Sequence, residues 1–200
     1  MLDVKVGSGA FMKNMQDAEK LAEEMVKIGS LAGRNTIAVI SDMDEPLGLA
    51  VGNALEVAEA VKTLKKEGPE DLINLCLELG TQMLIASKVE ENADKARGML
   101  QNSIDDGSAY NKFLEFIKRQ GGDITVFDDL DEFTECNYKI EVKADKEGYV
   151  QRIESELIGE ASMILGGGRM TKEDVIDYSV GVKLSAKRGD YVKCGDCLAT

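Results

Sequence analysis

The sequence predicts an α/β protein with a mixed or parallel sheet flanked by helices, followed by a small α+β domain. Leu2–Val6 alternates apolar and charged residues, and residues 36–40 form a short apolar run. One helical pattern separates these two segments, which is the strand–helix–strand order of a parallel pair. Strand-like alternation returns near residue 138 and indicates the second domain. We therefore expect two domains, over residues 1–135 and 136–200.

The first helix follows a Gly7-Ser8-Gly9 turn. Asn14 can cap its N-terminus, and Asp17 lies in its first turn, near the positive end of the helix dipole. Apolar residues then recur at helical spacing as far as Gly33, a residue that commonly ends helices. The next strand is expected over residues 36–40, and its nearly continuous apolar character is typical of a strand covered on both faces.

The middle third is predicted to be helical. Asn53 can cap a helix over residues 53–65, with Glu56 in the position of a capping box. A further helix should start at residues 68–71, because proline suits a first turn and acidic residues favour the N-terminal end of the dipole. Two more helices are expected over residues 92–103 and 108–119.

The last third combines strand patterns with one short helix. Alternation and turn residues predict the strands, and an acidic segment over residues 127–132 connects them to the helical part. Strands are expected over residues 138–143, 148–153 and 178–184, and a helix over residues 157–165 that runs into Gly166–Arg169.

Composition excludes several classes of function. The chain has 44% hydrophobic residues, enough for a core, and a formal net charge of −13. This charge opposes binding to nucleic acid polymers or to an anionic membrane. No apolar run reaches the roughly 20 residues of a membrane helix, and no signal-peptide pattern opens the chain. We expect a cytoplasmic protein whose four cysteines are reduced.

Two long motifs resemble the pyrimidine nucleoside and thymidine phosphorylases. They are LDVKVGSGAFM, at Leu2–Met12, and ISDMDEPLGLAVGNALEVAEAV, at Ile40–Val61. The GGGR and IDYSVG runs, at residues 166–169 and 176–181, resemble the small C-terminal domain of the same enzymes. The resemblance covers nearly the whole chain. It implies phosphorolysis of uridine, thymidine or deoxyuridine to free base and pentose 1-phosphate.

The resemblance also implies which part of the family's polypeptide is present. The LDVKVGSGAFM motif normally sits near the middle, so the chain would correspond to the later part of the central α/β domain plus most of the C-terminal domain. The N-terminal half would be absent and the C-terminal end shortened. Family homodimers join mainly through the helical N-terminal domain, so the resemblance does not say how this chain would associate.

The resemblance assigns no catalytic residue to this chain. The family's histidine, its lysine- and serine-rich phosphate cradle and its base-gripping residues all lie upstream of LDVKVGSGAFM, and the chain contains no histidine. Phe11 matches a wall residue of the base pocket. The Gly7-Ser8-Gly9 turn could form a phosphate nest, or it could be only a tight strand-to-helix turn.

The resemblance also implies a partial site for a monovalent cation, usually potassium. Its ligands would be the backbone carbonyls of Leu47 and Ala50 and the carboxylate of Glu59. A hard cation prefers oxygen ligands, which a turn beside a helical acid can provide. The remaining ligands would come from the absent half, so we expect no tight cation binding here. The alternative for Glu59 is a solvated acid on a helix surface.

Two other patterns have competing interpretations. Cys194 and Cys197 have the CxxC spacing of a redox or zinc site, but a zinc site needs two further ligands and histidine cannot supply them. The alternative is a pair of incidental thiols in a turn. Lys187–Gly195 resembles hairpins of biotinyl and lipoyl carrier domains without their modified-lysine signature. This similarity indicates a barrel-sandwich-like architecture for the C-terminal domain, with no carrier role.

Three functional hypotheses follow. The first is part of a pyrimidine nucleoside phosphorylase that is inactive alone, with phosphate and a pyrimidine nucleoside as substrates of the complete enzyme. The second is a non-catalytic scaffold or partner module that complements a separate N-terminal half. The third is a redox module that uses Cys194 and Cys197. Anthranilate phosphoribosyltransferase-like proteins share the architecture, but their acidic pair is replaced by Asp3-Val4-Lys5.

Overall fold

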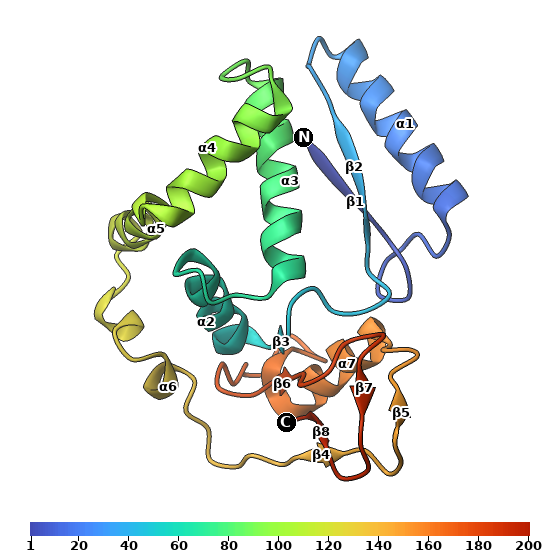
Figure 1. The fold of residues 1–200 in the computed structure, drawn as a ribbon, viewed down its shortest axis with the longest axis vertical. Helices are drawn as coiled ribbons and strands as arrows, with labels where there is room; N and C mark the ends of the chain where they lie inside the picture. The colour runs from blue at the N-terminus through green and yellow to red at the C-terminus, as the bar shows by residue number, and fades with distance from the viewer.

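The structure is a computed structural model that describes residues 1–200. Figure 1 shows three groups of elements, with α2 (Asn53–Leu64) between them. The first group contains β1, β2 and α1, the second contains the helices α3, α4 and α5, and the third contains α7 and the short C-terminal strands. The predicted fold class, a mixed α/β part with a small C-terminal domain, is confirmed.

A parallel strand pair and one covering helix form the N-terminal group. β1 (Leu2–Val6) pairs with β2 (Ala38–Asp42) in register from Leu2 with Ala38 to Val6 with Asp42. Helix α1 (Met15–Leu31) packs on this pair, and Val4, Ala18 and Ala22 form a buried cluster. The strand–helix–strand prediction is correct, although β2 begins two residues later than expected.

Of the two predicted helix caps, Asn14 is confirmed and Asn53 is not, and Asn92 caps a further helix. Asn14 accepts the backbone N–H of Asp17 at 3.0 Å, and Asn92 accepts that of Lys95 at 3.0 Å. The predicted cap at Asn53 is wrong, because Gly52 is the N-cap of α2. The side chain of Asn53 instead donates to the carbonyl of Gly167 at 2.8 Å, which ties α2 to the C-terminal group.

The helical group contains α3 (Glu70–Ala86), α4 (Ala93–Asp105) and α5 (Ser108–Arg119). An aromatic cluster fixes the acidic connector against this group. Phe127, in a 3-10 turn over Thr125–Phe127, is buried, and its ring centroid lies 5.0 Å from that of Phe113. Phe133, in the short helix α6 (Leu130–Phe133), places its ring tilted by 60° against that of Phe127, with the centroids 5.5 Å apart.

Strands in the C-terminal group are much shorter than predicted. Three antiparallel pairs of two or three residues replace the three longer strands, because the chain turns sharply and each segment meets a partner only briefly. Helix α7 (Ser155–Ser162) ends earlier than expected and passes into a π turn over Met163–Gly167. The strands are β4 (Val142–Lys143), β5 (Gly148–Tyr149), β6 (Val182–Lys183), β7 (Tyr191–Val192) and β8 (Cys197–Ala199).

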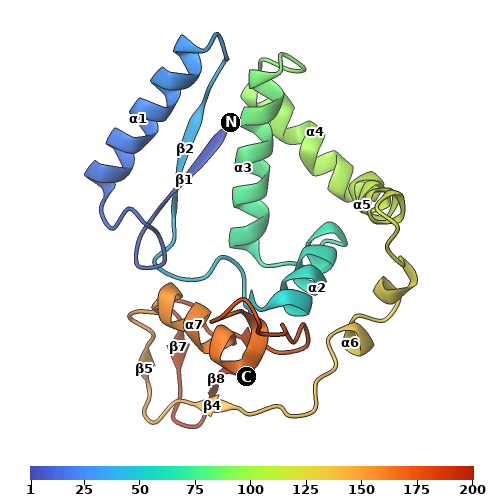
Figure 2. The ribbon, with the colours of Figure 1, turned by 180° about the vertical axis from the view of Figure 1, so that it is seen from behind.

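One strand pair connects the first half of the chain to the C-terminal group. β3 (Ala50–Val51), which immediately precedes α2, pairs with β6 from the C-terminal group. Figure 2, the view from behind, shows the connector passing along the outside of the molecule from α5 through α6 to β4. The proposed boundary near residue 135 lies on this connector and stays a prediction. None of the helices is both long and apolar enough to cross a membrane.

Val61 provides a test of the α2 packing, because its side chain is completely buried. Shortening it to alanine leaves a cavity, so Val61→Ala should lower the free energy of unfolding by about 2 kcal/mol. Val57→Ala is the matched control in the same helix, since Val57 is 38% exposed. Urea unfolding followed by circular dichroism measures both. Equal losses in the two variants would contradict this account of α2.

Candidate functional site

The loop between β2 and β3, residues 43–49, is the meeting point of the three groups of elements. Its turn requires glycine at position 48, where φ is +71°. A Cβ atom at this position would also lie 2.1 Å from Glu59 Oε2. Pro46 and Gly48 are buried, whereas the intervening Leu47 is 38% exposed. The backbone of this loop therefore lies directly against the carboxylate of Glu59.

Glu59, on α2, fixes the second half of the loop. Its Oε1 atom accepts the backbone N–H of Leu49 at 3.0 Å. Burial raises the pKa of Glu59, and the nearby carboxylates of Asp71 and Glu56 add to the rise, although the N–H groups of Leu49 and Ala50 oppose it. Glu59 is thus an acid whose ionised form is disfavoured by its surroundings, which does not fit the solvated-surface alternative.

The backbone of Ala50 faces the same side as Glu59. Leu184 donates its N–H to the carbonyl of Leu49 at 2.7 Å, and Ala50 lies opposite Lys183. Hydrogen-bonded and non-hydrogen-bonded positions alternate in an antiparallel pair. The N–H and C=O of Ala50 consequently point away from β6, and the Ala50 N–H lies close enough to Glu59 to lower the pKa of that carboxyl.

Asp71, in the first turn of α3, fixes the first half of the loop. Its Oδ2 atom accepts the N–H of Gly48 at 3.0 Å and lies 3.1 Å from the ammonium of Lys187. Burial alone raises the pKa of Asp71, but the Gly48 N–H and the Lys187 ammonium outweigh burial, so the pKa is below its ordinary value. Asp71 is therefore held as a carboxylate.

Two of the three expected cation ligands, Ala50 and Glu59, lie close together at this loop. The structure brings the carbonyl of Ala50 and the carboxylate of Glu59 to one side of β3, and Leu47 lies in the turn between buried neighbours. Carbonyl and carboxylate oxygens are the ligands that hard cations take. The loop already presents the carbonyls of Pro46 and Gly48 to a positive group, the ammonium of Lys187.

The Gly7-Ser8-Gly9 turn is locked to the β2–β3 loop. The N–H of Ser8 donates to Asp44 Oδ1 at 2.9 Å, and that of Gly9 donates to the carbonyl of Met43 at 3.0 Å. These bonds occupy the donors that a phosphate nest would need, so the geometry favours a structural turn. Phe11, which follows the turn, is 99% exposed.

The two CxxC thiols do not face a common centre. Cys194 donates to the carbonyl of Asp145 at 3.3 Å, and Cys197 donates to that of Ala199 at 3.3 Å. All four cysteines are free, and no three His, Cys, Asp or Glu side chains come together as a metal-binding group. The geometry favours incidental thiols.

The sequence patterns do not predict the roles of Asp71 and Lys187 at the loop. They indicate Asp71 only as an acidic residue in a first helical turn, and Lys187 only as part of a hairpin. The acidic character of residues 42–45 is the one sequence signal for a basic partner. That signal does not identify Lys187, which lies 141 residues after Pro46.

Comparison with known proteins places this geometry in a family. A model described as the glycosyl transferase family, a/b domain, matches residues 1–110, and one described as the pyrimidine nucleoside phosphorylase C-terminal domain matches residues 149–200. Pyrimidine-nucleoside phosphorylases from Staphylococcus aureus strains bovine RF122 / ET3-1, USA300 and NCTC 8325 are each 54% identical over 200 residues. These alignments cover 100% of this chain and 46% of each relative.

The a/b-domain model covers more than half of the chain, so the chain belongs to the glycosyl transferase family. The C-terminal match and the 54% identity throughout place it with the pyrimidine-nucleoside phosphorylases of that family, which confirms the resemblance stated from its motifs. The chain spans about half the length of the curated relatives it matches.

Asp42 provides a pH test of the contacts at this loop. Burial raises the pKa of Asp42, but the N–H of Asp44 and the guanidinium of Arg188, 2.9 Å away, outweigh burial. The pKa is therefore below its ordinary value. Lys187 also contributes to this lowering. A depressed pKa gives stability that is fully present above the unfolded value, about 3.9, and is lost as the pH falls through the folded value. The urea concentration at the unfolding midpoint should therefore decrease as the pH is lowered below about 4. The decrease should be smaller in Asp42→Asn.

Asp128→Asn is the control for this experiment, because Asp128 is exposed and its side chain has no hydrogen-bond or ion-pair partner. Asp128→Asn should show the same decrease in urea midpoint with falling pH as the wild type. An Asp42→Asn variant with the same pH profile as the wild type would show that the Arg188 contact contributes nothing to stability.

Proposed function

We propose that this chain forms part of an enzyme that cleaves pyrimidine nucleosides with inorganic phosphate. In this reaction the bond between C1′ and the base nitrogen breaks, a phosphate oxygen bonds to C1′, and the departing base takes up a proton. The products are uracil or thymine and a pentose 1-phosphate. The observation that supports this proposal best is 54% identity to pyrimidine-nucleoside phosphorylases along all 200 residues.

The chain's own residues would shape the site, and residues outside this chain would supply the catalytic groups. The transition state has oxocarbenium character, and negative charge builds on the leaving base, so the reaction needs a proton or hydrogen-bond donor there. The chain has no histidine. Its turn at Gly7-Ser8-Gly9 has its amides engaged within the protein. The catalytic and phosphate-binding groups would therefore come from residues outside these 200.

Phe11 would form a wall of the base pocket. Its ring is 99% exposed, directly after a turn that is fixed to the β2–β3 loop. An aromatic ring in this position is available to stack on a planar ligand or on a covering segment. The rigid turn would keep the ring in place without any catalytic role for it.

Leu47 and Ala50 would hold a potassium ion through their carbonyl oxygens, and Glu59 would hold it through its carboxylate. When bound, the ion would supply a cationic partner for the half-buried carboxylate of Glu59, which has no basic side chain paired with it. The loop and α2 are already joined by the bond between Leu49 and Glu59. Glu59 would thus orient the loop whether or not an ion is present, and the remaining ligands would come from residues outside this chain.

Complementation tests the proposed function. The purified chain alone should release no uracil from uridine and phosphate above a protein-free control. Mixed with the part of a Staphylococcus aureus relative that the chain does not match, it should form a complex with phosphate-dependent turnover. Release of base is measured by chromatography, with phosphate omitted as the control. Robust turnover by the chain alone would overturn the assignment of catalysis to other residues.

Potassium dependence tests the cation proposal separately. In the reconstituted complex, KCl should increase turnover relative to an equal concentration of choline chloride, and Glu59→Gln should remove this response. The chain alone should show the same thermal midpoint in both salts, because its ligand shell is partial. Glu19→Gln is the control, since Glu19 is an exposed acid on α1. A full potassium response in Glu59→Gln would eliminate this site.

A second candidate function is a non-catalytic partner module. Both outer edges of the β1–β2 pair lack a neighbouring strand, and two-stranded sheets are only marginally stable alone. Helix α1 also exposes Leu21, Ile28 and Leu31. Native mass spectrometry of the mixture detects the complex, and the chromatographic assay of released base measures its turnover. A stable complex without turnover favours the module, and a complex with turnover favours the enzyme.

A further inference from the structure

The ammonium of Lys187 occupies a site built from the β2–β3 loop and α3. It donates to the carbonyls of Pro46 and Gly48, the latter at 3.0 Å, and forms an ion pair with Asp71 Oδ2 at 3.1 Å. Glu45 Oε2 lies 3.9 Å away. A lysine ammonium has three donors, and here two of them bond to carbonyls while a carboxylate lies beside it as the ion-pair partner. Its side chain is only 19% exposed, unlike that of an ordinary surface lysine.

The next residue extends the same contact. Arg188 pairs with Asp42 at 2.9 Å and with Asp44 at 3.5 Å, and its backbone N–H donates to Glu45 Oε2 at 2.9 Å. The Arg188 side chain is 42% exposed, and exposed ion pairs contribute little to stability. The partly buried ammonium of Lys187 therefore provides the specific part of the contact, and Arg188 provides additional attraction.

The chain contains a second copy of this turn without the contact. Lys187–Asp190 and Lys193–Asp196 both read Lys-x-Gly-Asp, and in both turns the lysine N–H donates to the aspartate Oδ2 at 2.8 Å. Gly189 and Gly195 both have positive φ. Lys193 is exposed and has no ion-pair partner. The turn therefore forms without the loop, and burial of Lys187 is a feature of its site.

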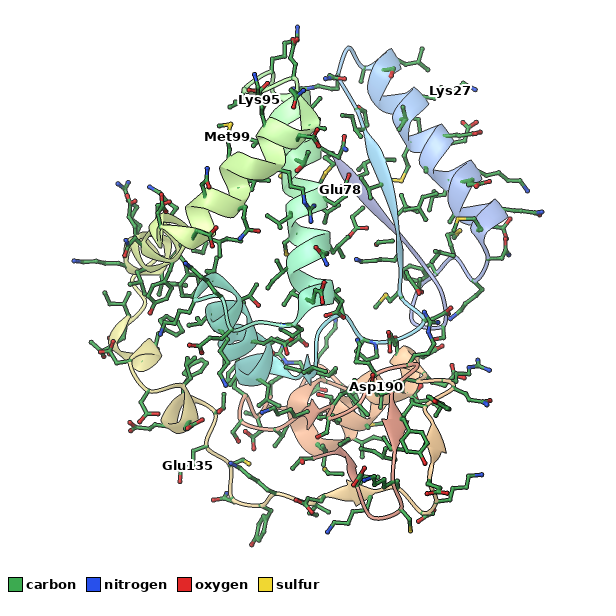
Figure 3. The ribbon with its side chains drawn as sticks, viewed as in Figure 1. Lys27, Glu78, Lys95, Met99, Glu135 and Asp190 are labelled. Atoms are coloured by element: carbon green, nitrogen blue, oxygen red, sulfur yellow. The ribbon has the colours of Figure 1, made fainter.

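We propose that Lys187 is the built-in cation of the β2–β3 loop, a positioning residue through which the C-terminal group holds this loop in shape. Figure 3 labels Asp190, in the Lys187–Asp190 turn, at the edge of the C-terminal group that faces the loop. Asp71 and Glu59 orient the Gly48 and Leu49 amides, and the Lys187 ammonium supplies the opposite charge. This inference does not depend on the proposed enzyme function or on potassium binding.

Amide hydrogen exchange by NMR tests the inference on the full chain. In Lys187→Met, the Gly48 and Leu49 amides should exchange at least roughly tenfold faster than in the wild type, while the α1 amides keep their rates. Added methylammonium should restore part of the protection, because it has N–H donors, and tetramethylammonium should not. Lys193→Met, the matched control, should exchange like the wild type.

Two outcomes of this experiment would overturn the inference. One is unchanged exchange of Gly48 and Leu49 in Lys187→Met, and the other is the same acceleration in Lys193→Met. If Lys187→Met loses amide protection along the whole chain, the inference is tested instead by the exchange of the lysine ammonium groups in the wild type. With ¹⁵N-lysine labelling, the Lys187 ammonium should exchange with water at least roughly tenfold more slowly than that of Lys193. Equal rates would refute the buried contact.

Discussion

The β2–β3 loop is the constraint on which the arrangement of the elements depends. It leaves the parallel pair at Asp42 and enters β3 at Ala50, and three elements bind it on the way. Glu59 binds it from α2, Asp71 from α3 and Lys187 from the C-terminal hairpin. Each contact uses a backbone N–H or C=O of the loop. The loop conformation is thus set by distant side chains acting on its main chain.

Local features of the fold are predictable from sequence because they depend on neighbouring residues. The Asn14 cap, the α5 boundaries and the parallel pair around α1 all follow from short-range patterns. The C-terminal strands are not predictable in the same way, because each forms only where a distant segment passes close by. The failure at Asn53 has the same cause, since its side chain satisfies the Gly167 carbonyl in place of the helix end.

The candidate site shows the same division between local and distant information. The family resemblance can single out Leu47, Ala50 and Glu59 as expected cation ligands, because they lie within one continuous motif. The partners of that motif, Asp71 and Lys187, lie outside it and have no distinctive spacing. Side chains that act on a backbone carbonyl also leave no signal in the residue type that they contact. Coordinates are needed to find them.

The charge of the chain explains why a single ammonium matters at this site. The chain has 37 acidic and 24 basic residues, and the loop region brings Asp42, Asp44, Glu45, Glu59 and Asp71 close together. Like charges at short range raise the free energy of the folded state unless cations offset them. Lys187 and Arg188 offset the acids of the loop and of α3, whereas no basic side chain reaches Glu59. The remaining uncompensated acid is therefore the one that the family resemblance assigns to a cation.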